Sequence, residues 1–195
     1  MTPPRRPLGP APDERDLHDA ALDYLARYAA TEVGLRRVLE RRIDRWARRA
    51  TALHATDAVA AQAAAARASV TAVVTRLVAA GAVNDATYAE ARARSLLRSG
   101  RSRRAATAQL AAKGVDAATA QSVLPSDEGS ELAAALVLAR RRRIGPFRTG
   151  PKPDAAAQRR ELGMLARAGF PQDVARRALA TDPEQAEALV NEFRR

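Results

Sequence analysis

The sequence predicts an all-α fold of tandem three-helix repeats that stack into an elongated curved array. Apolar residues recur every three or four positions along most of the chain, and no segment alternates with a period of two. Alanine supplies much of the 47% hydrophobic content, whereas aromatic residues make up only 4%. That balance favours thin helices in close contact over one thick core. A helix–glycine–helix pattern also occurs twice, with turns at Gly114 and Gly169.

The first 15 residues, MTPPRRPLGPAPDER, are predicted to form a disordered tail. Proline lacks a backbone donor and restricts the residue before it, so a helix cannot persist there. The helical period begins at Asp16 and predicts a helix that ends near Ala30. Its inward stripe consists of Leu17, Ala21, Leu25 and Tyr28.

Two longer helices are predicted next. Thr31 is the expected N-cap of a helix that reaches Ala50, and Asp57 is the expected N-cap of an alanine-rich helix that ends before Gly81. The inward stripe of the first of these helices is Leu35, Leu39, Ile43 and Trp46. Arginines crowd its outer face.

Shorter helices fill the rest of the chain, each with a recognisable start signal. The expected caps or first residues are Asn84 or Asp85, Ser102, Asp116, Ser126, Asp154, Pro171 and Asp182–Pro183. The helix that begins at Ser126 ends in four consecutive arginines, which complement the negative pole of its dipole. Residues 145–153, GPFRTGPKP, are predicted to be a loop without regular structure.

The repeat superposes residues 104–124 on residues 159–179. The matched pairs are Leu110 with Leu165, Gly114 with Gly169, Val115 with Phe170 and Leu124 with Leu179. Chance similarity among alanine-rich helices is the alternative explanation. The predicted division is a tail at 1–15, a first repeat with an enlarged connection at 16–83, a second repeat at 84–125, a third repeat with its loop at 126–182, and a C-terminal helix at 183–195.

Little in the sequence could carry catalysis. The absence of cysteine excludes disulfides and thiolate zinc sites. The two histidines, His18 and His54, have no second ligand at helical spacing, and no phosphate-binding glycine loop or nucleophile elbow is present. We therefore expect no enzymatic activity, cofactor or metal. The proline-rich start does not resemble a secretory signal, and we expect a soluble cytoplasmic protein.

The charge is more informative, because Lys+Arg 33 exceeds Asp+Glu 22 and leaves a formal net charge of +11. Such an excess attracts polyanions. The candidate binding residues are three clusters: Arg36, Arg37, Arg41 and Arg42; Arg98, Arg101, Arg103 and Arg104; and Arg140, Arg141, Arg142 and Arg143. A solvated face is the simpler interpretation of any one cluster. The second cluster is the most suggestive, since it lies at a predicted helix N-terminus, where backbone donors favour phosphate.

Aromatic residues that could stack on bases are not interleaved with these clusters. Tyr24, Tyr28 and Trp46 fall on inward stripes and are predicted to be core residues.

Several segments resemble one known family. Residues 77–81, LVAAG, followed by residues 84–89, NDATYA, are similar to a junction found in RecX regulatory proteins. Residues 98–115 are similar to the central repeat of that family, and residues 140–147 and 167–170 resemble its C-terminal repeat. The resemblance covers roughly residues 17–180 and favours alphaproteobacterial-type members. Residues 47–69 depart from it, because many members have a tight turn there.

The resemblance implies three tandem three-helix repeats and a regulator of the RecA recombinase. RecX-like proteins bind the RecA–DNA filament or block its extension, and so restrain recombination, ATP hydrolysis and the co-protease activity that triggers the SOS response in DNA repair. The expected partners are therefore the RecA filament and DNA, bound without sequence specificity by a monomer. The alternative is a basic helical DNA-binding protein that acts independently of RecA.

Overall fold

The computed structural model describes residues 9–151 and 153–195, and in these residues every regular element is a helix. The all-α prediction is confirmed. The chain divides into two compact units, one ending at Tyr88 and the other beginning at Ala89. The predicted division into three repeats is finer than this and stays a prediction. Most of the predicted tail lies in residues 1–8, outside the described residues, and the first helix already begins at Glu14.

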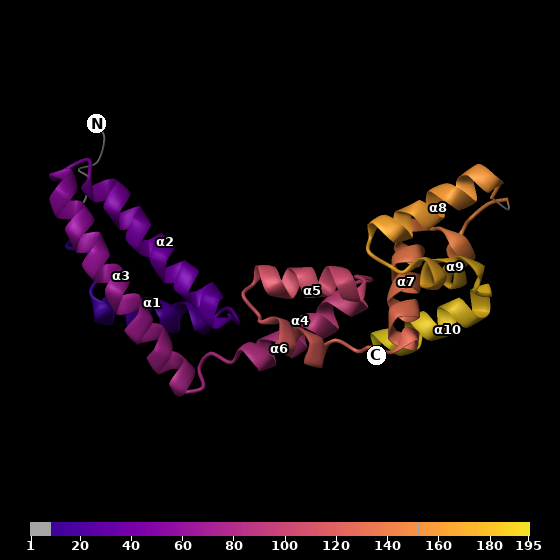
Figure 1. Cartoon of the computed structure of the whole chain (residues 1–195), viewed down its shortest axis with the longest axis horizontal. Coiled ribbons are helices and arrows are strands. Elements are labelled where there is room, and N and C mark those ends of the chain that lie inside the picture. Colours follow the sequence, from indigo (N-terminus) through magenta and orange to yellow (C-terminus); the bar gives the residue numbers. More distant parts are fainter. Residues whose placement is uncertain (1–8, 152) are drawn as a thin grey trace. The chain divides into compact units, whose positions relative to one another are not determined.

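The first unit is dominated by two long helices that lie side by side (Figure 1). Its helices are α1 (Glu14–Leu25), α2 (Glu32–Ala50) and α3 (Thr56–Ala79). The core between them includes the fully buried Leu35, Leu39 and Ile43, as the stripe on α2 predicted. The N-cap of α3 is Ala55, which makes no side-chain cap bond, so the prediction of Asp57 was wrong by two positions.

Helix α3 is long and apolar enough to cross a membrane by length and composition, with a mean hydropathy of 1.3 over its best window. The sequence analysis did not single it out. Its buried face includes Val70, Val73 and Val74, which pack in the core formed with α1 and α2. A helix that covers the core of a soluble protein passes the same test, so this finding gives little support to a membrane span.

Helix α1 ends at Leu25, earlier than predicted, and Tyr28 is 57% exposed rather than buried. The chain must turn here because the Thr31 cap requires extended backbone, with φ −80° and ψ 164°. Tyr28 instead packs against Tyr24, with ring centroids 5.2 Å apart. The local period correctly placed the helix but extended it into the turn.

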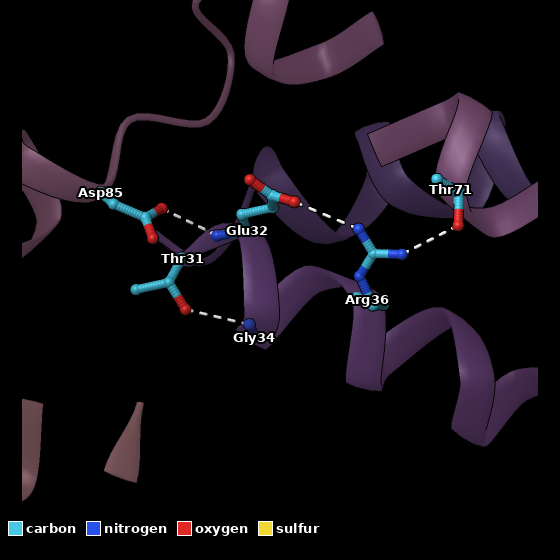
Figure 2. A network of polar contacts seen from close by, with 6 residues as sticks. All are labelled: Thr31, Glu32, Gly34, Arg36, Thr71 and Asp85. Atoms are coloured by element: carbon cyan, nitrogen blue, oxygen red, sulfur yellow. Dashed lines mark hydrogen bonds and ion pairs between the residues drawn. The ribbon is translucent and has the colours of Figure 1, made fainter. Parts of the chain in front are cut away.

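The N-terminus of α2 is fixed by side chains from three segments (Figure 2). The Thr31 hydroxyl accepts a hydrogen bond from the Gly34 amide at 2.9 Å, as predicted for an N-cap. The Glu32 amide donates to the carboxylate of Asp85 at 2.8 Å. Asp85 begins the next helix, where Asn84 accepts from the Thr87 amide at 2.9 Å. Asn84 therefore caps its own helix, whereas the Asp85 carboxylate accepts a hydrogen bond from an amide at the start of α2.

The second unit contains the remaining helices, apart from the first residues of α4 (Figure 1). They are α4 (Asp85–Arg98), α5 (Arg103–Ala112), α6 (Ala117–Val123), α7 (Glu128–Arg142), α8 (Ala155–Arg167), α9 (Gln172–Ala180) and α10 (Pro183–Arg194), with a short 3-10 helix η1 (Gly145–Phe147). Helix α7 is central to the core of α7 to α10, and its alanines at 134, 135 and 139 are fully buried. Small side chains therefore allow close packing here, as the composition predicted.

Two details of this unit differ from the predictions. Asp127 rather than Ser126 is the N-cap of α7, and it accepts from the Ser130 amide at 2.7 Å. The segment predicted to lack regular structure begins with η1, where the Arg148 amide donates to the Gly145 carbonyl at 3.2 Å. Residue 152 of that segment lies outside the described residues.

The paired glycines of the predicted repeat have matching geometry. Gly114 has φ 89° and Gly169 has φ 93°, the left-handed region that favours glycine. In both copies the amide after the glycine donates to the carbonyl of a fully buried leucine, from Val115 to Leu110 at 3.1 Å and from Phe170 to Leu165 at 3.2 Å. The two helix ends therefore share one turn motif.

Candidate anion-binding site

The first arginine cluster lies on α2, and its members differ in what they contact. Arg36 donates to the Glu32 carboxylate at 3.1 Å and to the Thr71 hydroxyl on α3 at 2.9 Å (Figure 2). The bond to Thr71 joins α2 to α3, so Arg36 has a structural role. Arg37, Arg41 and Arg42 are exposed along the same helix. This cluster is a helix face whose members come from one segment of sequence.

The second cluster surrounds the α4–α5 turn, but the N-terminus of α5 is already occupied. The Ser102 hydroxyl accepts from the Ala105 amide at 3.2 Å, and the Arg103 amide donates to the Glu131 carboxylate at 2.9 Å. The prediction that these amides favour phosphate is therefore not supported, because protein oxygens satisfy them. What remains available in this cluster is the set of exposed side chains of Arg98, Arg101 and Arg104, with Arg103 half-buried.

The third cluster ends α7 and also divides by role. Arg140 pairs with Glu187 on α10 at 3.3 Å, and Arg141 donates to the Ser99 carbonyl at 2.8 Å. Arg143 takes the left-handed conformation, with φ 54°, and ends the helix. Arg142 is exposed. The bond from Arg141 to Ser99 joins α7 to the end of α4, and so brings the third cluster to the second.

Residues of these two clusters meet around one pocket of about 490 Å³. The cationic side chains that line it are Arg101, Arg141, Arg142 and Arg167. Its apolar wall includes Leu138, Ile144, Met164 and Leu165. We call this site the inter-repeat arginine pocket, since its residues come from the α4–α5 turn, from α7 and the residues after it, and from α8. Arg167 was not among the predicted site residues.

The pocket depends on close packing of backbone segments. Gly100 has φ 81°, and a Cβ atom there would lie 2.8 Å from the backbone nitrogen of Leu138. Only glycine therefore lets the end of α4 approach α7 this closely. On the other side, the buried Ser102 hydroxyl donates to the Ala168 carbonyl at the end of α8, at 2.7 Å. These two contacts hold Arg101, which lies between them in sequence, at the pocket that Arg167 also lines.

The pocket has a strongly positive lining. No carboxylate is among its lining residues. In the described part of the chain, Arg101, Arg142 and Arg167 take part in no ion pair with a carboxylate. Guanidinium groups bind carboxylate and phosphate through paired hydrogen bonds, and an unpaired group retains that capacity. The arrangement can therefore bind an anionic group.

Glu131 is the acidic residue that supports this region. It is half-buried on α7, and burial raises the pKa of its carboxyl above the usual value. The hydrogen bond from the Arg103 amide and the nearby Arg103 charge oppose that shift. The carboxylate therefore satisfies the α5 N-terminus at some cost in desolvation.

The described residues contain no group of three His, Cys, Asp or Glu side chains placed to hold a metal ion. His18 lies near Asp19, with Nδ1 3.7 Å from a carboxylate oxygen.

Comparisons with known proteins show which family the chain resembles. A family model described as RecX, second three-helix domain, matches residues 84–124. The chain is 41% identical over 182 residues to a regulatory protein RecX from Myxococcus xanthus, covering 92% of this chain and 91% of that protein. It is 36% identical over 111 residues to a regulatory protein RecX from Agrobacterium fabrum, covering 57% of this chain and 59% of that protein.

The fold also matches a crystal structure of RecX from Lactobacillus salivarius, with a TM-score of 0.57 and 17% identity over 92% of this chain and 96% of that one. At that identity the match concerns the fold alone. The Myxococcus relative is similar along nearly the whole chain, and the family model matches the segment that contributes Arg101 to the pocket. The chain therefore belongs to the RecX family of regulatory proteins.

Proposed function

We propose that this protein binds the RecA–DNA filament in the cytoplasm and restrains RecA recombinase, ATPase and co-protease activity without catalysing a reaction itself. Membership of the RecX family supports this proposal, since the resemblance of this chain to RecX regulatory proteins implies action on RecA. The observation that carries it in this chain is the inter-repeat arginine pocket, where cations from distant segments meet without a carboxylate in the lining.

A RecA–DNA filament presents both DNA phosphates and acidic side chains, and arginine can bind either. The net charge of +11 would draw the protein toward such a surface. The pocket adds geometry to that attraction, because four arginines from three separate segments line it together with an apolar wall. We expect the pocket to contact the filament directly.

The test is a titration of this protein into RecA strand exchange and single-strand-dependent ATP hydrolysis at two salt concentrations. We expect inhibition at amounts far below those that saturate the DNA. If phosphate contacts contribute, the inhibitory concentration should rise steeply with salt. No inhibition of either activity, at protein concentrations where binding to the filament is measured directly, would contradict the proposal.

The second candidate is a sequence-nonspecific DNA-binding protein that acts independently of RecA, which the overall charge favours. The same titration separates the two. Inhibition that begins only when the DNA is coated, and that applies equally to an unrelated DNA-dependent enzyme, would support this candidate instead. Size-exclusion chromatography with light scattering tests the expected monomer in the same preparation.

A further inference from the structure

The first unit contains a second basic pocket, at the C-terminal part of α2, around a tryptophan that was predicted to be a core residue. The pocket has a volume of about 560 Å³, and four of its lining residues are Arg42, Arg45, Arg48 and Arg49. Trp46 lines it between them. The predicted cluster contained only Arg42 from this set, so most of the pocket is new. We call it the Trp46 pocket.

The indole of Trp46 has two different surroundings. Part of the ring packs against the core of α1 to α3, as predicted, but the side chain remains half-buried and lines the pocket. Its Nε1–H donates to the Gly9 carbonyl at 3.1 Å. The one polar atom of the ring is therefore satisfied within the protein, and what the ring can offer to a ligand is its apolar, π-electron surface.

The arginines are spaced to flank that ring. Arg42, Trp46 and Arg49 follow one another at i, i+4 and i+7, which places them on one face of α2, a turn or less apart. Arg45 and Arg48 also line the pocket and add to its cationic surface. Among the described residues, none of these four arginines forms an ion pair with a carboxylate.

The pocket has one acidic lining residue, Asp16 of α1. Its carboxylate accepts from the Asp13 amide at 3.3 Å and completes the capping box of α1. The remaining lining residues, Pro10 and Pro12, carry no charge. Four cations against one carboxylate, which is itself hydrogen-bonded, leave the pocket strongly positive.

We infer that the Trp46 pocket binds single-stranded nucleic acid, with a base against the Trp46 indole and the adjoining phosphates on the α2 arginines. An aromatic surface beside a cationic track is the combination that proteins use to hold unpaired strands, because every base has a π-face and every linkage carries a negative charge. An acidic protein segment would satisfy the arginines but would make no use of the part of the indole that lines the pocket. Duplex DNA would offer phosphates but no unstacked base.

The inference shares the nucleic-acid partner of the proposed function but can be tested without RecA, so failure of one is distinguishable from failure of the other. Trp46 is the one tryptophan of the chain, and its fluorescence therefore reports this pocket alone. The full-length protein is titrated with an oligothymidylate, with an abasic oligonucleotide of the same length and charge, and with polyglutamate. Emission of Trp46 is recorded together with the anisotropy of labelled ligand.

We expect the oligothymidylate to quench Trp46 and to bind about tenfold more tightly than the abasic strand, since stacking on an aromatic side chain contributes at least that much. Trp46→Leu should abolish the preference for bases, and Trp46→Phe should retain most of it. Double replacement of Arg45 and Arg49 by Ala should lower the affinity for both strands to a similar extent. Replacement of the exposed Arg160, in the other unit, by Ala should change neither affinity.

Circular dichroism and thermal unfolding establish that each variant is folded. If Trp46→Leu does not fold, quenching of the wild type and the ligand preference of Trp46→Phe still decide the question. Equal affinity of the wild-type protein for the two strands, the absence of quenching by oligothymidylate at saturation, or equal quenching by polyglutamate would overturn the inference.

Discussion

The two units expose arginine in different ways. In the first unit the cations of α2 line one helix, so residues near in sequence form the basic surface. In the second unit the inter-repeat arginine pocket takes Arg101, Arg142 and Arg167 from three separate segments. A basic helix face needs only helical periodicity, whereas a converging pocket needs tertiary packing. The first should therefore tolerate packing changes that disrupt the second.

The sharpest test of this contrast is charge reversal in the pocket. Arg101→Glu, Arg142→Glu and Arg167→Glu combined should weaken inhibition of RecA about a hundredfold, because attraction at three converging sites becomes repulsion. The control reverses three exposed arginines outside both basic pockets, Arg27, Arg160 and Arg195, with the same change in net charge.

The two triple variants are compared by the concentration at which each inhibits ATP hydrolysis by RecA. Equal weakening by the control would mean that net charge alone governs binding and that the pocket has no special role. Circular dichroism checks that the helical content of each variant is intact.

Glycine substitution compares the packing of the two units directly. Gly100→Ala should destabilise the protein by about 2–3 kcal/mol, because positive φ strain and a contact with the Leu138 backbone add together. Gly81→Ala, at a positive φ of 72° with open space around the Cβ position, should cost only about 1 kcal/mol. Urea unfolding measures both, and equal costs would show that close approach of α4 to α7 is unimportant.

The Ser102 hydroxyl joins the second repeat to the end of α8. Ser102→Ala should cost about 1–2 kcal/mol, since it removes a helix cap and leaves the partly buried Ala168 carbonyl without its donor. Asp154→Ala removes an exposed cap of the same unit, on α8, and should cost less. Thermal unfolding ranks the two variants. A larger loss at Asp154 would mean that the Ser102–Ala168 contact contributes little.

The smallest expected effect is a pH dependence at Glu131. Because its pKa is raised above the ordinary value of 4.5 in the folded protein, the folded state binds the proton more strongly than the unfolded chain. Stability from this group is therefore present below pH 4.5 and is lost as the pH rises through the folded pKa.

Glu131→Gln keeps a side-chain acceptor for the Arg103 amide without the charge, and should be more stable relative to the wild type at about pH 7 than at about pH 4. Urea unfolding at the two pH values measures the difference. A difference that is independent of pH would contradict the assigned role of burial.

Local signals predicted the helices well. Thr31, Ser102 and Asp116 are N-caps as expected, because a side-chain oxygen at that position satisfies nearby amides whatever the surroundings. The misses are at places where a distant segment decides the outcome. Asp85 is an example: it is a helix-start residue in the sequence, but its carboxylate binds the Glu32 amide of another helix.

The same limit applies to the candidate sites. The arginine clusters were predicted by counting charge along the sequence. Arg36 was included, although it pairs with Glu32 on α2 and joins α2 to α3 through Thr71. Arg167 was missed because it is not part of an arginine cluster in the sequence; it is the last residue of α8. Trp46 was assigned to the core because helical spacing shows which face turns inward, but not where that face ends.

Local sequence patterns were enough to predict the helical class, most helix starts, the glycine turns and the excess of positive charge. Each of these depends on interactions within a few residues: backbone conformation, capping bonds and helical period. Tertiary packing determines which cations line a common pocket and which pair with a carboxylate. Arg101 and Arg167 line one pocket because Gly100 packs against α7 and Ser102 binds the end of α8. Contacts between segments 66 residues apart, such as Ser102 with Ala168, leave no local signal.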